Sequence, residues 1–220
     1  MPGLAYTLDL SAPHHHTAQV AMTVPCADLG DTVDVAMPAW CPGSYMIRDY
    51  ARFVRDLEVQ GDDGAPRRAV KIDKSTWRIE RGGARTLTVR YGVYGHDLSV
   101  RTNHIDGSHA FLHGPATFLY VEALRRLPAQ VEVMVPPGWQ LAAGLARRGA
   151  SSSDPFGAGV GRVVLLADSV DELFDGPIHL GVTNHRRFVA AGAQIELAVW
   201  GETPRGGAFT VDDLARDLAA

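Results

Sequence analysis

Three histidines stand within ten residues of one another, at His104, His109 and His113, on both sides of the segment Asp106-Gly107-Ser108. Neutral imidazole is a common ligand of zinc and other transition metals, so this spacing could surround one ion. Such a site would make the chain a small metal-dependent hydrolase, but it also needs carboxylates that orient the imidazoles. The alternative is polar loop histidines that hydrogen-bond to the backbone. We expect this alternative, and therefore neither a metal nor a cofactor in this chain.

The other histidines and the known catalytic motifs add no reacting group. The sequence has no His-Glu-x-x-His zinc helix, no glycine-rich phosphate loop, no Cys-x-x-Cys pair and no Gly-x-Ser-x-Gly elbow. We predict that these residues include no catalytic side chain. The histidines outside the cluster are interpreted as structural: His14, His15 and His16 in a turn, and the isolated His96, His179 and His185.

The segment 38–50 combines two prolines and a glycine with aromatic side chains and an Arg-Asp pair. Aromatic residues and arginine are the usual anchors of protein interfaces. The loop either docks a partner or folds back on its own core as an internal plug. We expect docking, through Trp40, Tyr45, Arg48 and Tyr50.

The elements that must position these residues are strands. Apolar residues alternate with polar ones from Leu4 to Leu10, from Val20 to Val24 and from Val33 to Met37, which is typical of half-buried strands. About ten further segments have strand character, among them 98–105 and 118–121, and glycine turns separate consecutive strands. We predict a mainly β fold of about a dozen strands, an antiparallel sandwich or saddle-like domain with one or two short helices. Trp77, Trp139 and Trp200 are expected in its core.

Composition narrows the class of protein. The formal net charge of −4, without basic clusters, argues against nucleic acid as a partner. The longest apolar run, 163–167, is far shorter than the roughly 20 residues of a membrane helix, and the first ten residues do not resemble a signal peptide. We therefore expect a cytoplasmic protein without membrane contact. Cys26 and Cys41 fit neither a disulfide framework nor a zinc site and are expected to be reduced thiols.

The C-terminal end of the sequence predicts a domain boundary. Thr210 and Asp213 resemble a helix cap, and the apolar spacing that follows is helical but ends at Ala220. We expect one all-β domain over 1–200, then a linker and the beginning of another domain over 201–220.

Several motifs, in a fixed order, resemble the N-terminal domain of the glycyl aminopeptidase family. These are Trp40-x-Pro42-Gly43-Ser44-Tyr45-x-Ile47-Arg48-Asp49-Tyr50, Lys71-Ile72-Asp73-Lys74 with Trp77, Leu98-Ser99-Val100-Arg101-Thr102, Pro136-x-Gly138-Trp139, and Asp171-Glu172-Leu173-x-Asp175-x-Pro177. Members of that family are gluzincin zinc metallopeptidases, often with a PDZ domain. The resemblance implies a saddle-like β domain whose partners are its own catalytic domain and a peptide substrate. The catalytic zinc and its ligands would then lie beyond Ala220.

The resemblance also implies a role at the substrate. An N-terminal domain of this kind forms one wall of the active-site cleft, and one of its loops helps to hold the amino end of the peptide. The matching loop supplies Arg101, Thr102, Asn103, His104 and Asp106 as candidates. Asn103 and Asp106 could accept hydrogen bonds from an ammonium group, although both also suit a plain turn. A free-standing β-sandwich that binds peptide or carbohydrate is the competing hypothesis.

Overall fold

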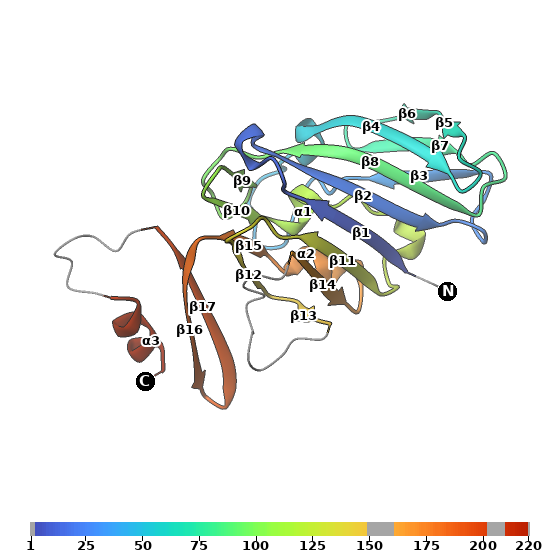
Figure 1. Cartoon of the computed structure of the whole chain (residues 1–220). Coiled ribbons are helices and arrows are strands. Elements are labelled where there is room, and N and C mark those ends of the chain that lie inside the picture. Colours follow the sequence, from blue (N-terminus) through green and yellow to red (C-terminus); the bar gives the residue numbers. More distant parts are fainter. Residues whose placement is uncertain (1–2, 149–160, 202–209, 220) are drawn as a thin grey trace.

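A computed structural model describes residues 3–148, 161–201 and 210–219 of the chain. Strands dominate it, and they form four sheets (Figure 1). The strands are β1 (Leu4–Asp9), β2 (Thr17–Pro25), β3 (Thr32–Ala36), β4 (Val54–Gly61), β5 (Pro66–Arg67), β6 (Ala69–Lys71), β7 (Thr76–Glu80), β8 (Thr86–Tyr94), β9 (His104–Ile105), β10 (His109–Leu112), β11 (Ala129–Met134), β12 (Gln140–Ala143), β13 (Ala146–Arg147), β14 (Arg162–Ala167), β15 (Ile178–Gly181), β16 (Thr183–Ala190) and β17 (Ala193–Trp200).

Helices are short and sit at the connections. Three are α-helical and three are single 3₁₀ turns within the described ranges: α1 (Gly114–Thr117), α2 (Val170–Asp175), α3 (Val211–Ala219), and the 3₁₀ turns Pro13–His15, Tyr50–Phe53 and Glu122–Leu124. The mainly β, antiparallel class predicted from the sequence is confirmed, with more strands than the dozen expected.

The largest sheet has eight strands in the order β13-β14-β11-β1-β2-β8-β4-β5. Its pairs are antiparallel except β1 with β11, which run parallel. Along β2, Ala18, Val20, Met22 and Val24 all point inward and are buried, as their period-two spacing requires. A second sheet, β12-β15-β10-β9, contributes to the same hydrophobic core, and β3-β7-β6 forms a third. The core therefore lies between layers of strands, as in a sandwich.

The segment 118–121 is predicted as a strand, but only Tyr120 makes a bridge, to Ala36. Tyrosine side chains replace the missing strand partners. The Tyr91 hydroxyl accepts a hydrogen bond from the Leu119 amide at 2.9 Å, and the Tyr6 hydroxyl donates to the Leu119 carbonyl at 2.8 Å. Side chains from the large sheet thus satisfy the buried backbone of Leu119, while β3 bonds to its neighbour Tyr120.

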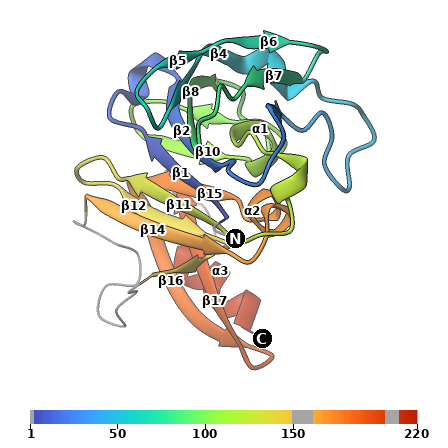
Figure 2. The same ribbon diagram turned by 90° about the vertical axis from the view of Figure 1, so that its right-hand side faces the viewer.

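The fourth sheet is a hairpin of β16 and β17 that projects from the body of the molecule (Figures 1 and 2). Helix α3 packs beside β16, where Arg186 and Asp212 form an ion pair. The predicted cap of this helix is confirmed: the Asp213 amide donates to the Thr210 hydroxyl at 3.1 Å, and the Thr210 amide donates to the Asp213 carboxylate at 2.9 Å. Arg147 on β13 reaches Glu196 on β17 at 3.2 Å, which ties the hairpin to the main body.

Candidate functional site

The tight turn between β9 and β10 is organised by Asp106. Its Oδ1 accepts hydrogen bonds from the Ser108 amide and the Ser108 hydroxyl, both at 2.7 Å, and from the His109 amide at 3.0 Å. Partial burial raises the pKa of this carboxyl, but the hydrogen bonds from Ser108 and His109 outweigh it and hold the pKa well below its usual range. Asp106 is therefore an ionised carboxylate beside a largely buried hairpin.

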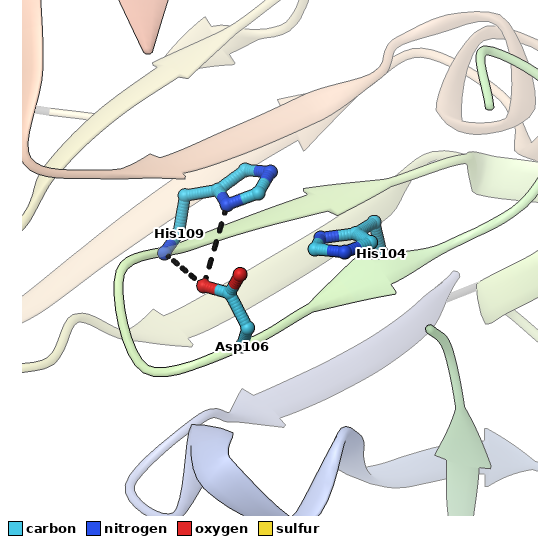
Figure 3. Close-up of side chains that lie close together, drawn as sticks. All are labelled: His104, Asp106 and His109. Atoms are coloured by element: carbon cyan, nitrogen blue, oxygen red, sulfur yellow. Dashed lines mark hydrogen bonds and ion pairs between the residues drawn. The ribbon is translucent and has the colours of Figure 1, made fainter. Parts of the chain in front are cut away.

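His104 and His109 flank this turn on the two paired strands (Figure 3). Their rings lie 4.7 Å apart at an angle of 23°, and the two residues are only 8% and 2% exposed. The Nδ1 atom of His109 lies 3.4 Å from Oδ1 of Asp106. Burial lowers the pKa of both imidazoles, so both rings are uncharged at neutral pH.

Further rings extend this pair into a column. The ring of His96 packs against His104 with centroids 5.3 Å apart, and the indole of Trp200 stacks on His109 at 3.6 Å. The indole nitrogen of Trp200 also donates to the Ser108 hydroxyl at 3.2 Å. Because Trp200 ends β17, these contacts attach the projecting hairpin to the β9–β10 turn. Trp77 and Trp139 are core residues as predicted, whereas Trp200 is 36% exposed.

A pocket of about 420 Å³ opens beside this column. Among the described residues, no carboxylate or cationic side chain lines it, and burial lowers the pKa of its third imidazole, His179, to about 4. The pocket therefore suits an apolar, uncharged group. Its lining residues are Leu98, Ser99, Val100, His104, His109, Phe111, His179, Ala198, Val199 and Trp200.

The residues of the loop predicted to hold substrate lie in different places: some line the pocket and others are buried in the core. Residues 98–103 form turns instead of the expected strand, because the Thr102 hydroxyl bonds back to the carbonyl and the carboxylate of Asp97 at 3.2 and 3.1 Å. His104 reaches the pocket, whereas Arg101 is exposed and is not among the lining residues.

Asn103 is 3% exposed and fully engaged inside the domain. Its amide donates to the Ala116 carbonyl at 3.2 Å, and its Oδ1 accepts from the His113 amide at 2.8 Å and the Thr117 hydroxyl at 3.2 Å. A side chain with these partners has no oxygen to offer an ammonium group. The substrate-binding role predicted for Asn103 is therefore corrected to a structural one.

The third histidine of the cluster lies elsewhere. The ring of His113 packs edge-on against Tyr50, with centroids 5.8 Å apart, and burial lowers its pKa. The triad of histidines considered from the sequence is thus not formed. The group that comes together instead is His104, Asp106 and His109, whose candidate ligand atoms all lie within 4.8 Å of one another.

The aromatic loop is part exposed and part buried. Tyr45 is 96% exposed, its neighbours Met46 and Ile47 are exposed as well, and Trp40 is 47% exposed. Arg48 is half-buried, and its Nε donates to the Ser44 hydroxyl at 3.3 Å. Ser44 and Arg48 thus bond to each other within the loop, whereas the aromatic tip is exposed to solvent.

Tyr50 is fully buried, so the prediction that it belongs to the docking surface is wrong. It lies in the 3₁₀ turn Tyr50–Phe53, which directs its ring toward His113 and its hydroxyl to within 3.6 Å of Cys41 Sγ. Cys41 and Cys26 are both buried and are not bonded to each other. Burial raises the pKa of the Tyr50 hydroxyl.

Sequence reasoning missed Phe111, His179 and Trp200 at the pocket. Phe111 and His179 are register partners on β10 and β15, and Trp200 reaches them from a separate sheet. No local pattern links these residues, because they are far apart in the sequence. Among the residues that the structure describes, no helix is long and apolar enough to cross a bilayer.

One family model matches most of the chain, and solved structures of peptidases are similar to it. The model of the Peptidase M61 N-terminal domain matches residues 5–182. A crystal structure of an aminopeptidase N family protein from Idiomarina loihiensis is 29% identical with a TM-score of 0.81, over 90% of this chain and 32% of that one.

A substrate-bound M1 zinc metallopeptidase from Deinococcus radiodurans is more distant. It is 14% identical with a TM-score of 0.47, over 99% of this chain and 52% of that one. No curated protein matches. The chain spans about a third of the Idiomarina structure. With four-fifths of its residues inside the matched range, the chain belongs to the Peptidase M61 N-terminal domain family.

Proposed function

We propose that the chain is the non-catalytic N-terminal domain of a longer zinc metallo-aminopeptidase. The observation that carries this proposal is the family match over 5–182, together with a similar crystal structure whose chain is about three times as long. The zinc, the glutamate that activates its water and the peptide-cleaving step all belong to the catalytic domain that we propose to follow. This chain supplies surfaces to that domain and to the substrate.

The first surface is the exposed tip of the aromatic loop, formed by Trp40, Tyr45, Met46 and Ile47. An exposed cluster of large apolar side chains is unusual on a surface that remains in water. Interfaces between domains of one chain bury about 600–1,500 Å² and are anchored by aromatic residues. We assign this tip to the contact with the catalytic domain.

The second surface is the pocket beside the histidine column, which we assign to one wall of the active-site cleft. It lies between the matched domain, which ends at residue 182, and the hairpin β16–β17, which follows it. Its uncharged lining favours an apolar side chain of the peptide. The boundary predicted at residue 200 stays a prediction, although the family match ends earlier.

The amino end of the peptide is not assigned to this loop. Asn103 is engaged in the core, Arg101 carries the wrong charge for an ammonium, and Asp106 uses one of its two carboxylate oxygens, Oδ1, to hold its own turn. We therefore keep the assignment of this domain to one wall of the cleft. In that role the wall supplies a pocket for a side chain of the peptide and not a site for its ammonium group.

The experiment uses the longer protein encoded by the gene, assayed with aminoacyl substrates beside the 220-residue chain. We expect the longer protein to hydrolyse them and the 220-residue chain not to. Val100 lines the pocket yet is 77% exposed, so Val100→Asp should leave folding intact. It should raise KM for substrates with an apolar side chain by about tenfold, because a charge at the rim opposes apolar binding.

The matched control is Val70→Asp, at a 41% exposed position of β6 in a different sheet. Its kinetics should equal those of the wild type. A longer protein without peptidase activity would contradict the proposed enzyme class. An active enzyme whose KM is unchanged by Val100→Asp would remove only the assignment of the pocket.

The competing function, a free-standing module that binds peptide or carbohydrate, predicts no hydrolysis by any product of the gene. It also predicts that the 220-residue chain binds its ligand alone. The same assay separates the two functions.

A further inference from the structure

Two imidazoles and one carboxylate face one another at the β9–β10 hairpin (Figure 3). They are His104, Asp106 and His109, and each can offer one ligand atom within 4.8 Å of the other two. The hairpin fixes their spacing, because His104 and His109 lie on paired strands and Asp106 lies in the turn between them. Three potential ligands thus come from one short, well-hydrogen-bonded element.

The Nδ1 atoms of the two imidazoles are buried and poorly satisfied. Nδ1 of His104 makes no hydrogen bond to any residue that the structure describes, and Nδ1 of His109 has only the long contact of 3.4 Å to Oδ1 of Asp106. A buried polar atom left without a partner costs about 1–3 kcal/mol, so proteins rarely retain one without an ion or a water that satisfies it. The expectation that loop histidines bond to the backbone is therefore wrong for the Nδ1 atoms of these two residues.

The charge state of the cluster also suits a cation. Burial lowers the pKa of both imidazoles, and the hydrogen bonds from Ser108 and His109 lower the pKa of the Asp106 carboxyl. Metal ligands must be deprotonated in this way before they bind. The cluster contains one carboxylate, and no lysine or arginine of the described part of the chain lines the pocket beside it.

We propose that His104, Asp106 and His109 bind one divalent transition-metal ion, of the class of zinc or cobalt. Two nitrogens and one carboxylate oxygen favour these ions over calcium or magnesium, which take oxygen ligands. Ligands about 2 Å from a tetrahedral ion lie about 3.3 Å from one another, so the side chains must close in by about 1.5 Å from their widest separation. Turning the imidazoles about their side-chain bonds would provide this movement, and it would also shift the stack of His109 on Trp200.

The ion would join the two strands of the hairpin and fix the turn against the pocket. Three protein ligands leave one position for water or another small ligand. The site is separate from the zinc of the proposed catalytic domain, because all three ligands lie in this chain. It is also independent of the proposed function, since a binding module without a catalytic domain would contain the same site.

The test is a cobalt titration of the tag-free 220-residue chain after treatment with a chelator. We expect one Co²⁺ per chain, the visible absorption of a tetrahedral site, and a rise in Tm when Zn²⁺ is added. Asp106→Asn keeps an oxygen that accepts the amide hydrogen bonds of the turn but removes the charge. It should weaken binding at least tenfold, and His104→Gln should do the same.

The matched control is the double variant His14→Gln and His15→Gln, at exposed neighbouring imidazoles far from the hairpin in sequence. It should bind as the wild type does. Circular dichroism confirms that each variant is folded. The proposal is overturned if the folded wild type binds no cobalt, if Asp106→Asn and His104→Gln bind it unchanged, or if binding disappears in the control variant.

Discussion

At the scale of single residues, Asn103 shows how one side chain can hold a loop in place. Its amide group connects three backbone or hydroxyl groups of the segment 113–117 to the loop that precedes β9. Removing the amide leaves the Ala116 carbonyl and the His113 amide without this partner, whereas the Thr117 hydroxyl keeps its bond to the His113 carbonyl at 2.9 Å. The loop next to His104, which lines the pocket, then loses the contacts that hold it in place.

Asn103→Ala should therefore lower the free energy of unfolding by about 2–4 kcal/mol, because it leaves buried polar groups unpaired. Urea unfolding of the 220-residue chain measures this. Asn184→Ala, at an exposed position on β16, is the control and should change stability by less than about 0.5 kcal/mol. Equal stability of Asn103→Ala and the wild type would show that the asparagine has no structural role.

Features that depend on neighbouring residues could be predicted from the sequence, whereas features that depend on contacts between distant residues could not. Alternation along β2 and the cap at Thr210 are local signals, and both were predicted correctly. Tyr50 was assigned to the surface because composition cannot show that a 3₁₀ turn directs its ring inward. Phe111, His179 and Trp200 meet across different strands and sheets, so no window of sequence contains the pocket.

At the scale of elements, the hairpin β16–β17 is attached to the body by a few side chains. These are the stack of Trp200 on His109, the Arg147–Glu196 ion pair and the partly buried side chain of His185. A two-stranded hairpin alone is marginal in water, so these contacts and helix α3 decide whether it stays in place.

Acid should loosen this hairpin through His185. Burial first, and then the neighbouring His179 and two arginines, lower its pKa to about 4. The unfolded state, with a pKa near 6.5, binds the proton first, so stability is full above about pH 6.5 and falls as pH drops toward 4. Urea unfolding at several pH values should show a loss of about 1–3 kcal/mol in the wild type.

His185→Gln should remove part of that pH dependence, because a glutamine has no proton to gain. His14→Gln, at an exposed position, should leave the pH dependence as it is in the wild type. Identical pH profiles for the wild type and His185→Gln would contradict the assignment.

At the scale of the whole molecule, two surface features concern contact with a larger protein. The exposed tip of the aromatic loop and the uncharged pocket are both surfaces that a larger peptidase would cover or use. The central claim is that this domain works as one part of such an enzyme. A catalytic domain in contact with the tip would shield Tyr45, Met46 and Ile47 from solvent.

Hydroxyl-radical footprinting tests that claim directly, with the 220-residue chain and the longer protein labelled under the same conditions. We predict fast labelling of Tyr45 and Met46 in the 220-residue chain and strong protection of both in the longer protein. Met134, 39% exposed on β11, serves as the control and should be labelled equally in both. Equal labelling of Tyr45 and Met46 in the two proteins would contradict the claim that a catalytic domain docks on this loop.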